Sequence, residues 1–268
     1  MHKKIKLVIS GSGTRYPVQL GAIIRLLELG IQIEEVVGTS GGAICAAALG
    51  SGYDKNSLLK LATATLPSNV LEKNWLPFGG TKSRYSNNKI IRTFRTLFVE
   101  TFAECKIPVH IVAHNWSRKI KQVFQKDKED LPLAVNASMC LPIFDMVEIA
   151  GDLFEDGGID ANFYIDYQDW EIKNDTPVIG LRIRSTADLD PNPRKNPVTK
   201  IDRIFGTVSD LIEACDKEHI EDALWAKTIV LQTSYAGLKL DIREQDVVKM
   251  IQEGKDCINQ ALKEGILG

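Results

Sequence analysis

A glycine-rich pentapeptide, Gly-Thr-Ser-Gly-Gly at positions 38–42, constrains the fold of this chain more than any other sequence feature. It follows a stretch rich in Ile and Val at 31–37 and opens an Ala-rich stretch at 41–49. That order predicts a strand that turns directly into a helix, with Ser40 exposed at the turn as in the G-x-S-x-G nucleophile elbow. A glycine-rich strand-to-helix turn with an unreactive serine fits the same five residues.

The composition excludes several classes of protein. With 44% hydrophobic residues over 268 positions, the chain can bury a large core. A formal net charge of −2 provides no global attraction for nucleic acid. No stretch approaches the ~20 apolar residues of a membrane span, and the apolar run behind the basic N-terminus breaks at Gly11, unlike a signal peptide. We therefore expect a cytoplasmic protein, with peripheral contact to a membrane left open.

The cysteines and histidines do not form a metal-binding pattern. The five cysteines are scattered without C-x-x-C spacing, as expected for free thiols in a reducing compartment. Cys215 and His219 are four positions apart, as are His110 and His114, but neither pair has a third and fourth ligand nearby. The sequence therefore predicts no metal site.

Strand and helix patterns alternate along the chain. The predicted strands are 5–10, 31–37, 108–113, 121–125, 153–155, 178–183 and 228–232. The predicted helices are 17–29, 41–49, 55–66, 89–98, 131–139, 201–224 and 244–263, and a long irregular connection is predicted at 66–89. Alternation of this kind predicts an α/β fold with a parallel sheet covered on both faces. Because no repeat or linker interrupts it, a single domain is expected over residues 1–268.

A nucleophilic Ser40 needs a base, and the sequence offers two kinds. Histidine is the usual choice, and His219 lies among charged residues on a predicted helix. Asp156 instead ends a predicted strand and precedes Gly157 and Gly158, a turn that could hold its carboxylate against a serine. Such a carboxylate would need burial to raise its pKa. Asp-Gly pairs also form ordinary turns, but Asp156 is the better candidate, because His219 fits a surface or packing histidine better than a base.

Three motifs in order resemble those of the patatin-like phospholipase family. They are the glycine-rich turn Ser-Gly-Ser-Gly-Thr-Arg-Tyr at 10–16, the G-x-S-x-G motif at 38–42, and Asp-Gly-Gly at 156–158. The family pattern is D-G-G-G-x-R-G, G-x-S-x-G and D-G-G/A. More loosely, 135–144 resembles the Ala-Ser segment that precedes the family's aspartate, and 251–255 resembles part of its C-terminal helix. The resemblance implies a three-layer α/β/α fold with a mostly parallel central sheet.

The same resemblance implies a lipid acyl hydrolase of the phospholipase or lysophospholipase type. Ser40 is implied to be the nucleophile that forms an acyl-enzyme, and Asp156 to be its base. Arg15 is implied to bind substrate, near an anionic head group or intermediate. The implied partner is a phospholipid or another acyl lipid, and neither a metal nor an organic cofactor is implied. The oxyanion hole is implied to consist of N–H groups from Gly11, Ser12, Gly13 and Gly41.

The glycine-rich turn departs from the family pattern at three positions. Ser10 replaces the leading acid, Ser12 the middle glycine and Tyr16 the final glycine. Ser12 keeps its backbone N–H, so the oxyanion hole is retained if the local φ and ψ suit a residue other than glycine. Tyr16 is expected to crowd the start of the helix or to line the pocket, which affects the choice of substrate more than the chemistry.

A membrane-docking segment is suggested by Trp75-Leu76-Pro77-Phe78, which precedes a stretch at 81–97 with five basic and no acidic residues. An aromatic loop beside basic residues could dock on anionic lipid, but a core-capping loop beside a solvated helix face is the interpretation that these residues favour. Two other functions also stay open. One is a non-lipid serine esterase or acyltransferase, with the same dyad or with His219, and the other is a patatin-fold binding protein without activity.

Overall fold

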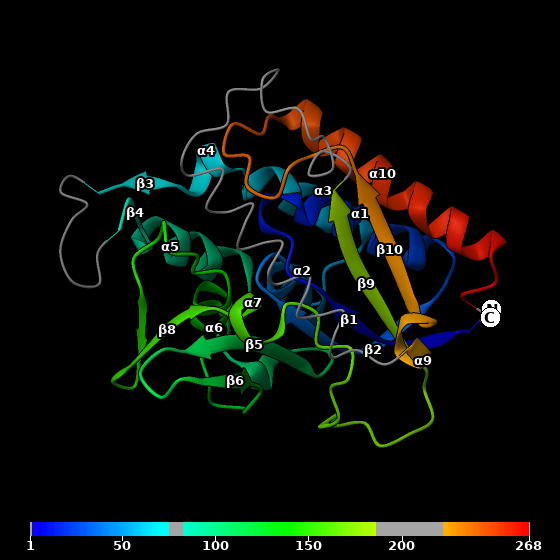
Figure 1. Ribbon diagram of the computed structural model, residues 1–268, viewed down its shortest axis with the longest axis horizontal. Coiled ribbons are helices and arrows are strands. Elements are labelled where there is room, and N and C mark those ends of the chain that lie inside the picture. Colours follow the sequence, from blue (N-terminus) through cyan, green and yellow to red (C-terminus); the bar gives the residue numbers. More distant parts are fainter. Residues whose placement is uncertain (1, 75–82, 186–221, 268) are drawn as a thin grey trace.

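The computed structural model describes residues 2–74, 83–185 and 222–267, and its centre is a mixed β-sheet (Figure 1). Its strands are β1 (Lys4–Ile9), β2 (Gln32–Thr39), β5 (Val109–Asn115), β6 (Ile120–Phe124), β7 (Val147–Ile149), β8 (Asp152–Asp156), β9 (Val178–Ser185) and β10 (Thr228–Thr233). Hydrogen-bonded neighbours in the described sheet follow the order β10-β9-β1-β2-β5-β8-β7, with β2 and β8 on one edge of β5 and β6 on its other edge. A separate small sheet pairs β3 (Glu72–Lys73) with β4 (Tyr85–Ser86).

The sheet has a parallel part and an antiparallel part, which meet at β5. The strands β10, β9, β1, β2 and β5 pair in parallel. The pairs β5–β6, β5–β8 and β7–β8 are antiparallel. The connections from β5 to β6 and from β7 to β8 are tight turns, which are too short for the crossover that a parallel pair needs. The expected mostly parallel sheet is therefore confirmed, with a mixed arrangement on one side.

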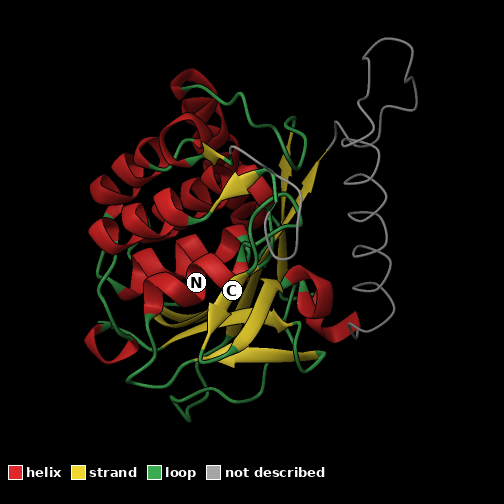
Figure 2. Ribbon diagram, turned by 90° about the vertical axis from the view of Figure 1, so that its left-hand side faces the viewer, coloured by secondary structure: helices red, strands yellow, loops and turns green. Residues whose placement is uncertain are grey.

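One face of the sheet carries most of the helices (Figure 2). They are α1 (Tyr16–Glu28), α2 (Gly41–Gly50), α3 (Lys55–Ala64), α4 (Pro67–Val70), α5 (Asn88–Leu97), α6 (Leu131–Ser138) and α10 (Glu244–Lys263). The opposite face is covered by α7 (Gly158–Ala161), by the segment 162–170 and by α9 (Asp222–Trp225). This arrangement confirms the expected layers of helix, sheet and helix.

Strand periodicity explains why both faces are covered. In β1, Ile5, Leu7 and Ile9 point into the core beneath α1, whereas Val8 points into a second cluster on the other face. Successive side chains of a strand alternate between faces. A strand buried on both sides therefore reads as a continuous apolar run, which is typical of the parallel part of an α/β sheet.

Several predicted elements match the structure and others do not. The helix predicted at 244–263 has the bounds of α10. The connection predicted as irregular at 66–89 contains α4, β3 and β4, and its residues 75–82 lie outside the described part of the chain. Of the helix predicted at 201–224, only residues 222–224 are described, and they form the start of α9. The short strand β7 was not predicted from the sequence.

Candidate active site

Ser40 lies at the junction of β2 and α2, where the sequence predicts a sharp turn. Its φ is +52° and its ψ is −122°, a conformation that L-residues other than glycine rarely adopt. The following turn of backbone lies close to β1, because a Cβ added to Gly42 would approach the carbonyl oxygens of Ile9 and Ser10 to 2.5 and 2.6 Å. A glycine is required there so that the helix can start directly behind the serine. The strained serine and the close glycine together have the backbone geometry of a nucleophile elbow.

Asp156 contacts the hydroxyl of Ser40. The Ser40 Oγ donates a hydrogen bond of 2.7 Å to Oδ2 of Asp156. The other carboxylate oxygen, Oδ1, accepts a 2.8 Å hydrogen bond from the backbone N–H of Gly158. Both side chains are buried, with residue exposures of 5% for Ser40 and 4% for Asp156. The Asp-Gly-Gly turn therefore orients the carboxylate toward the serine, as general-base chemistry requires.

The sheet topology explains how two residues 116 positions apart meet. The last paired residue of β2, Thr39, lies opposite Val112 of β5. The last residue of β8, Asp156, lies opposite the next residue of β5, Ala113. Strands β2 and β8 thus run toward each other along the same edge of β5 and end head to head. Ser40 and Asp156 lie at this meeting point.

Burial changes the acidity of Asp156. Loss of hydration raises the pKa of its carboxyl group from 3.8 to about 6, because burial penalises the charged form. The hydrogen bonds from Ser40 and from the Gly158 N–H act in the opposite direction, and the nearby charge of Glu155 adds slightly to the increase. A carboxylate with a pKa near 6 is ionised at neutral pH and is a stronger base than an exposed aspartate.

Ser138, at the end of α6, holds the backbone of the elbow. Its Oγ accepts a 2.8 Å hydrogen bond from the backbone N–H of Ser40 and donates a 2.5 Å hydrogen bond to the carbonyl oxygen of Val112. Sequence reasoning singled out no role for this serine. The only signal was its place in the Ala-Ser segment that resembles the family.

The glycine-rich turn lies next to the elbow. Among the described residues, the backbone N–H groups of Ser12, Gly13 and Gly41 donate to no protein acceptor, and Gly13 and Gly41 line the same cavity as Ser40. The N–H of Gly11 is different, since it donates a 2.8 Å hydrogen bond to the carbonyl oxygen of Asn162. Of the four expected oxyanion donors, Ser12, Gly13 and Gly41 are therefore available and Gly11 is engaged elsewhere.

Arg15 faces the turn that contains it. The residue is buried, its Nε donates a 3.1 Å hydrogen bond to the carbonyl oxygen of Ser12, and its guanidinium packs close to Gly237. It is absent from the residues that line the cavity at Ser40. This position favours a role for Arg15 in holding the glycine-rich turn and argues against the expected contact with substrate.

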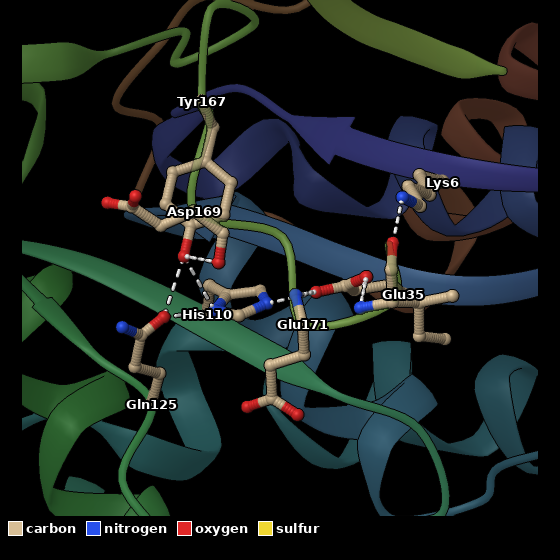
Figure 3. A network of polar contacts seen from close by, with 8 residues as sticks. Lys6, Glu35, His110, Gln125, Tyr167, Asp169 and Glu171 are labelled. Atoms are coloured by element: carbon tan, nitrogen blue, oxygen red, sulfur yellow. Dashed lines mark hydrogen bonds and ion pairs between the residues drawn. The ribbon is translucent and has the colours of Figure 1, made fainter. Parts of the chain in front are cut away.

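His110 and His114 have side-chain partners other than Ser40. Both ring nitrogens of His110 are engaged, at 2.7 Å from Glu35 and 2.6 Å from Gln125, in the buried network of Figure 3. His114 follows Ala113, the residue opposite Asp156, so its side chain points to the other face of the sheet, where Nδ1 lies 2.6 Å from Asp160. His219 lies outside the described residues.

An apolar cavity opens beside Ser40. Its polar end is formed by Gly13, Ser40 and Gly41, and Tyr16 lies in its wall with its hydroxyl 2.5 Å from Oγ1 of Thr65. The rest of the wall is predominantly apolar and includes Ile44, Val70, Phe94, Leu141, Phe144, Leu238 and Leu240. The cavity therefore has a polar end at Ser40 and an otherwise predominantly apolar wall. Of the two expectations for Tyr16, lining the pocket is the one that the structure supports.

Two further observations concern metals and membranes. In the part of the chain that the structure describes, no cluster of three or more His, Cys, Asp or Glu side chains is arranged to hold a metal ion. Within the same residues no helix combines the length and apolar character that a membrane crossing requires. The segment Trp75-Leu76-Pro77-Phe78, expected to dock on lipid, lies outside the described residues.

Comparison with solved structures shows a similar fold in other proteins. The structure is similar to that of VipD from Legionella pneumophila, with a TM-score of 0.55 and 14% sequence identity over 98% of this chain and 67% of that chain. It is also similar to full-length ExoU from the type III secretion system of Pseudomonas aeruginosa, solved in complex with SpcU, with a TM-score of 0.53 and 14% identity. That alignment covers 100% of this chain and 53% of the other. At this identity the likeness concerns the fold.

No curated protein sequence matches the chain. The sequence model of the family described as patatin-like phospholipase matches residues 7–167, a span that begins before the glycine-rich turn and ends after the Asp-Gly-Gly turn. The chain therefore belongs to the patatin-like phospholipase family.

Proposed function

We propose that this protein is a lipid acyl hydrolase that cleaves carboxylic esters through a Ser40–Asp156 dyad and an acyl-enzyme. The observation that carries the proposal is the 2.7 Å hydrogen bond from Ser40 Oγ to Asp156 at the polar end of an apolar cavity. Family membership supports a lipase-type function. The raised pKa of the buried Asp156 supports its role as the base.

The proposed reaction has two halves. Asp156 takes the proton of Ser40 as Oγ attacks the ester carbonyl, and the tetrahedral oxyanion receives hydrogen bonds from free N–H groups of the glycine-rich turn and of Gly41. The carbonyl re-forms, the bond to the alcohol breaks, and Asp156 returns the proton to the leaving alkoxide. In the second half, water loses a proton to Asp156 and attacks the acyl-enzyme. The fatty acid leaves, and the proton on Asp156 returns to the Oγ of Ser40.

The direct test uses purified protein and two kinds of substrate. Phospholipid vesicles and a soluble short-chain ester are incubated with the enzyme, released fatty acid is measured by mass spectrometry, and Ser40 is probed with a fluorophosphonate. Fatty acid release from vesicles together with labelling of Ser40 is expected. Turnover of the soluble ester alone would indicate a non-lipid esterase or acyltransferase. Absence of both turnover and labelling would indicate a binding protein.

The pH dependence follows from the acidity of Asp156. The base must be ionised, and its carboxyl group has a pKa of about 6. We therefore expect kcat/KM on a soluble ester to be constant above pH ~7 and to fall about tenfold for each pH unit below the pKa. A pH profile between 4.5 and 9 measures this limb. A profile that stays flat down to pH 4.5 would contradict the assignment of Asp156 as a base with a raised pKa.

The acyl-chain preference is expected to depend on the cavity wall. Leu240 is half-buried and lines the cavity, so Leu240→Trp should shorten the space for an acyl chain. Each methylene excluded from apolar contact costs about 0.8 kcal/mol, or roughly fourfold in affinity. We expect the ratio of kcat/KM for a long-chain ester to that for a butyryl ester to fall at least about tenfold. Val248→Trp is the control, because Val248 is 68% exposed on α10. An equal change in both variants, or in neither, would place the acyl chain elsewhere.

Contact with a membrane remains part of the proposal. A water-soluble lipase must take its substrate from an interface, and Trp75 and Phe78 are the sequence's best candidates for that contact. Cytoplasmic localisation with peripheral contact to anionic lipid is consistent with this reading.

A further inference from the structure

The carboxamide of Gln19 lies between the two serines that distinguish the glycine-rich turn of this chain. Gln19 belongs to α1 and is fully buried. Its Nε2 donates a 2.8 Å hydrogen bond to the backbone carbonyl of Ser10, and its Oε1 accepts a 2.8 Å hydrogen bond from the hydroxyl of Ser12. Because a backbone carbonyl can only accept, the orientation of the amide is set, and the Ser12 hydroxyl must be the donor.

Further hydrogen bonds extend this network along the turn. The hydroxyl of Ser10 donates to the carbonyl oxygen of Gly11 at 3.0 Å and accepts from the N–H of Ile183 in β9 at 3.2 Å. The carbonyl oxygen of Ser12 accepts from both the backbone N–H and the Nε of Arg15, each at 3.1 Å. The three consecutive carbonyl groups of residues 10–12 are therefore all held.

Holding these carbonyl groups also fixes two N–H groups. A peptide unit is planar and trans, so its C=O and N–H point in opposite directions. The bonded carbonyl of Gly11 thus orients the N–H of Ser12, and the bonded carbonyl of Ser12 orients the N–H of Gly13. These are two of the N–H groups that donate to no acceptor among the described residues. Donors fixed before the reaction stabilise a developing charge without reorganisation.

The side chain of Ser12 is accommodated by a neighbouring glycine. A Cβ added to Gly41 would overlap the Oγ of Ser12, so the absence of a side chain at position 41 leaves room for the hydroxyl. Ser12 has a φ of −147° and a ψ of −6°, outside the regular helix and strand regions. Gln19 binds the side chain of Ser12 and Arg15 binds its carbonyl oxygen, so Ser12 is held from both sides.

We propose that Gln19 is a positioning residue for the oxyanion hole, which it holds through Ser10 and Ser12. It acts on the N–H groups of Ser12 and Gly13 and does not touch substrate. This inference rests on the proposed acyl-transfer reaction at Ser40. It assigns a purpose to the two serines that replace the acid and the glycine of the family pattern.

The first test is Gln19→Met, which keeps the length of the side chain and removes its hydrogen bonds. Misoriented oxyanion donors raise the free energy of the transition state more than that of the bound ester. The kcat on a soluble ester should therefore fall about 10- to 100-fold. KM should change less than about threefold, because the ground-state carbonyl carries little charge. The rate of covalent labelling by a fluorophosphonate should fall by a factor similar to that for kcat, since its tetrahedral adduct uses the same donors.

Gln125→Met is the matched control. The Oε1 of Gln125 accepts a hydrogen bond from the hydroxyl of Tyr167 and also lies within hydrogen-bond distance of Nδ1 of His110. These contacts belong to the separate network of Figure 3. Its replacement should leave kcat and the labelling rate within about twofold of the wild type. An equal loss of kcat in Gln19→Met and Gln125→Met would mean general destabilisation and would overturn the proposal.

Coupling between Gln19 and Ser12 is the second test. Ser12→Ala removes only the hydroxyl that Gln19 binds, and it should lower kcat at least about threefold by itself, a loss within the range for one buried hydrogen bond. If Gln19 acts through Ser12, the double variant Gln19→Met/Ser12→Ala should lose much less than the product of the two single losses. Losses that multiply would overturn the proposal. Should Gln19→Met not fold, an unchanged kcat in Ser12→Ala would overturn it.

The outcomes also separate this inference from the proposed function. If the wild type neither turns over esters nor reacts with fluorophosphonate, the proposed function and the role of Gln19 fail together. If the wild type is active, Ser40→Ala is inactive and Gln19→Met retains wild-type kcat, only the positioning role is overturned.

Discussion

Ser40→Ala is expected to lower kcat/KM on a soluble carboxylic ester by at least about 10⁴-fold, the scale seen when a covalent nucleophile is removed from a serine hydrolase. The reason is that Ser40 supplies the hydroxyl that Asp156 would deprotonate. Among the described residues, the Asp156 carboxylate accepts hydrogen bonds only from that hydroxyl and from the N–H of Gly158. Covalent labelling by a fluorophosphonate should disappear as well. Steady-state kinetics and intact-protein mass spectrometry measure these two results.

The fold should survive this change. Alanine has the same Cβ as serine, so the strained φ of +52° costs the variant no more than the wild type. Thermal unfolding should therefore change little, and Ser234→Ala, at an exposed serine that binds Glu253, is a suitable control for activity. Turnover by folded Ser40→Ala at the wild-type rate would remove Ser40 from the mechanism, and labelling of a different serine would identify another nucleophile.

Asp156→Asn is expected to lower kcat by at least about 10²-fold, the usual scale for the loss of a general base. Asparagine has nearly the same shape, so the backbone of the turn and the hydrogen bond from the Gly158 N–H can be retained while the proton acceptor is lost. His219→Ala and His114→Ala should each change kcat less than about threefold under the same reasoning. A large loss in either histidine variant combined with a small loss in Asp156→Asn would replace the dyad with a histidine-containing triad.

Asp156→Asn should raise the stability of the fold, although it lowers activity. In the folded protein the pKa of Asp156 is raised from 3.8 to about 6, so the unfolded chain loses this proton at a lower pH than the folded chain. The contribution of Asp156 to the free energy of unfolding is therefore unaffected below pH ~4, falls as the pH rises to about 6, and stays low above it. A shift of this size corresponds to about 3 kcal/mol, because one pKa unit is worth 1.36 kcal/mol.

Asparagine does not ionise, so Asp156→Asn avoids this loss. We expect the variant to be more stable than the wild type at pH 8, by up to about 3 kcal/mol, and equal to it near pH 4. Urea unfolding at both pH values measures the difference. A variant that is less stable at pH 8 than at pH 4, relative to the wild type, would show that the ionised carboxylate stabilises the fold.

Local elements were predictable because their signals lie within a few residues. The bounds of α10 follow from an amphipathic repeat that ends near Gly265, and the turn at Ser40 follows from glycines between an apolar strand and an Ala-rich helix. The short elements α4 and β7 have too few residues to show a period. The strands β6 and β8 were predicted, but their antiparallel pairing with β5 was not, because pairing direction depends on the path of the chain and leaves little trace in strand composition.

The sequence by itself determined the sharp strand-to-helix turn at Ser40, the alternation of strands and helices, and the order of the three motifs that place the chain in its family. These properties depend on local sterics, on periodicity and on residue identity, which the sequence states directly. Only the tertiary structure decided that Ser40 and Asp156 meet, since β2 and β8 end against each other on the edge of β5. It also decided that Gly11 is engaged and that Gln19 reaches both Ser10 and Ser12. Such contacts depend on packing between segments that are distant in the sequence. The burial that raises the pKa of Asp156 exists only in the folded chain.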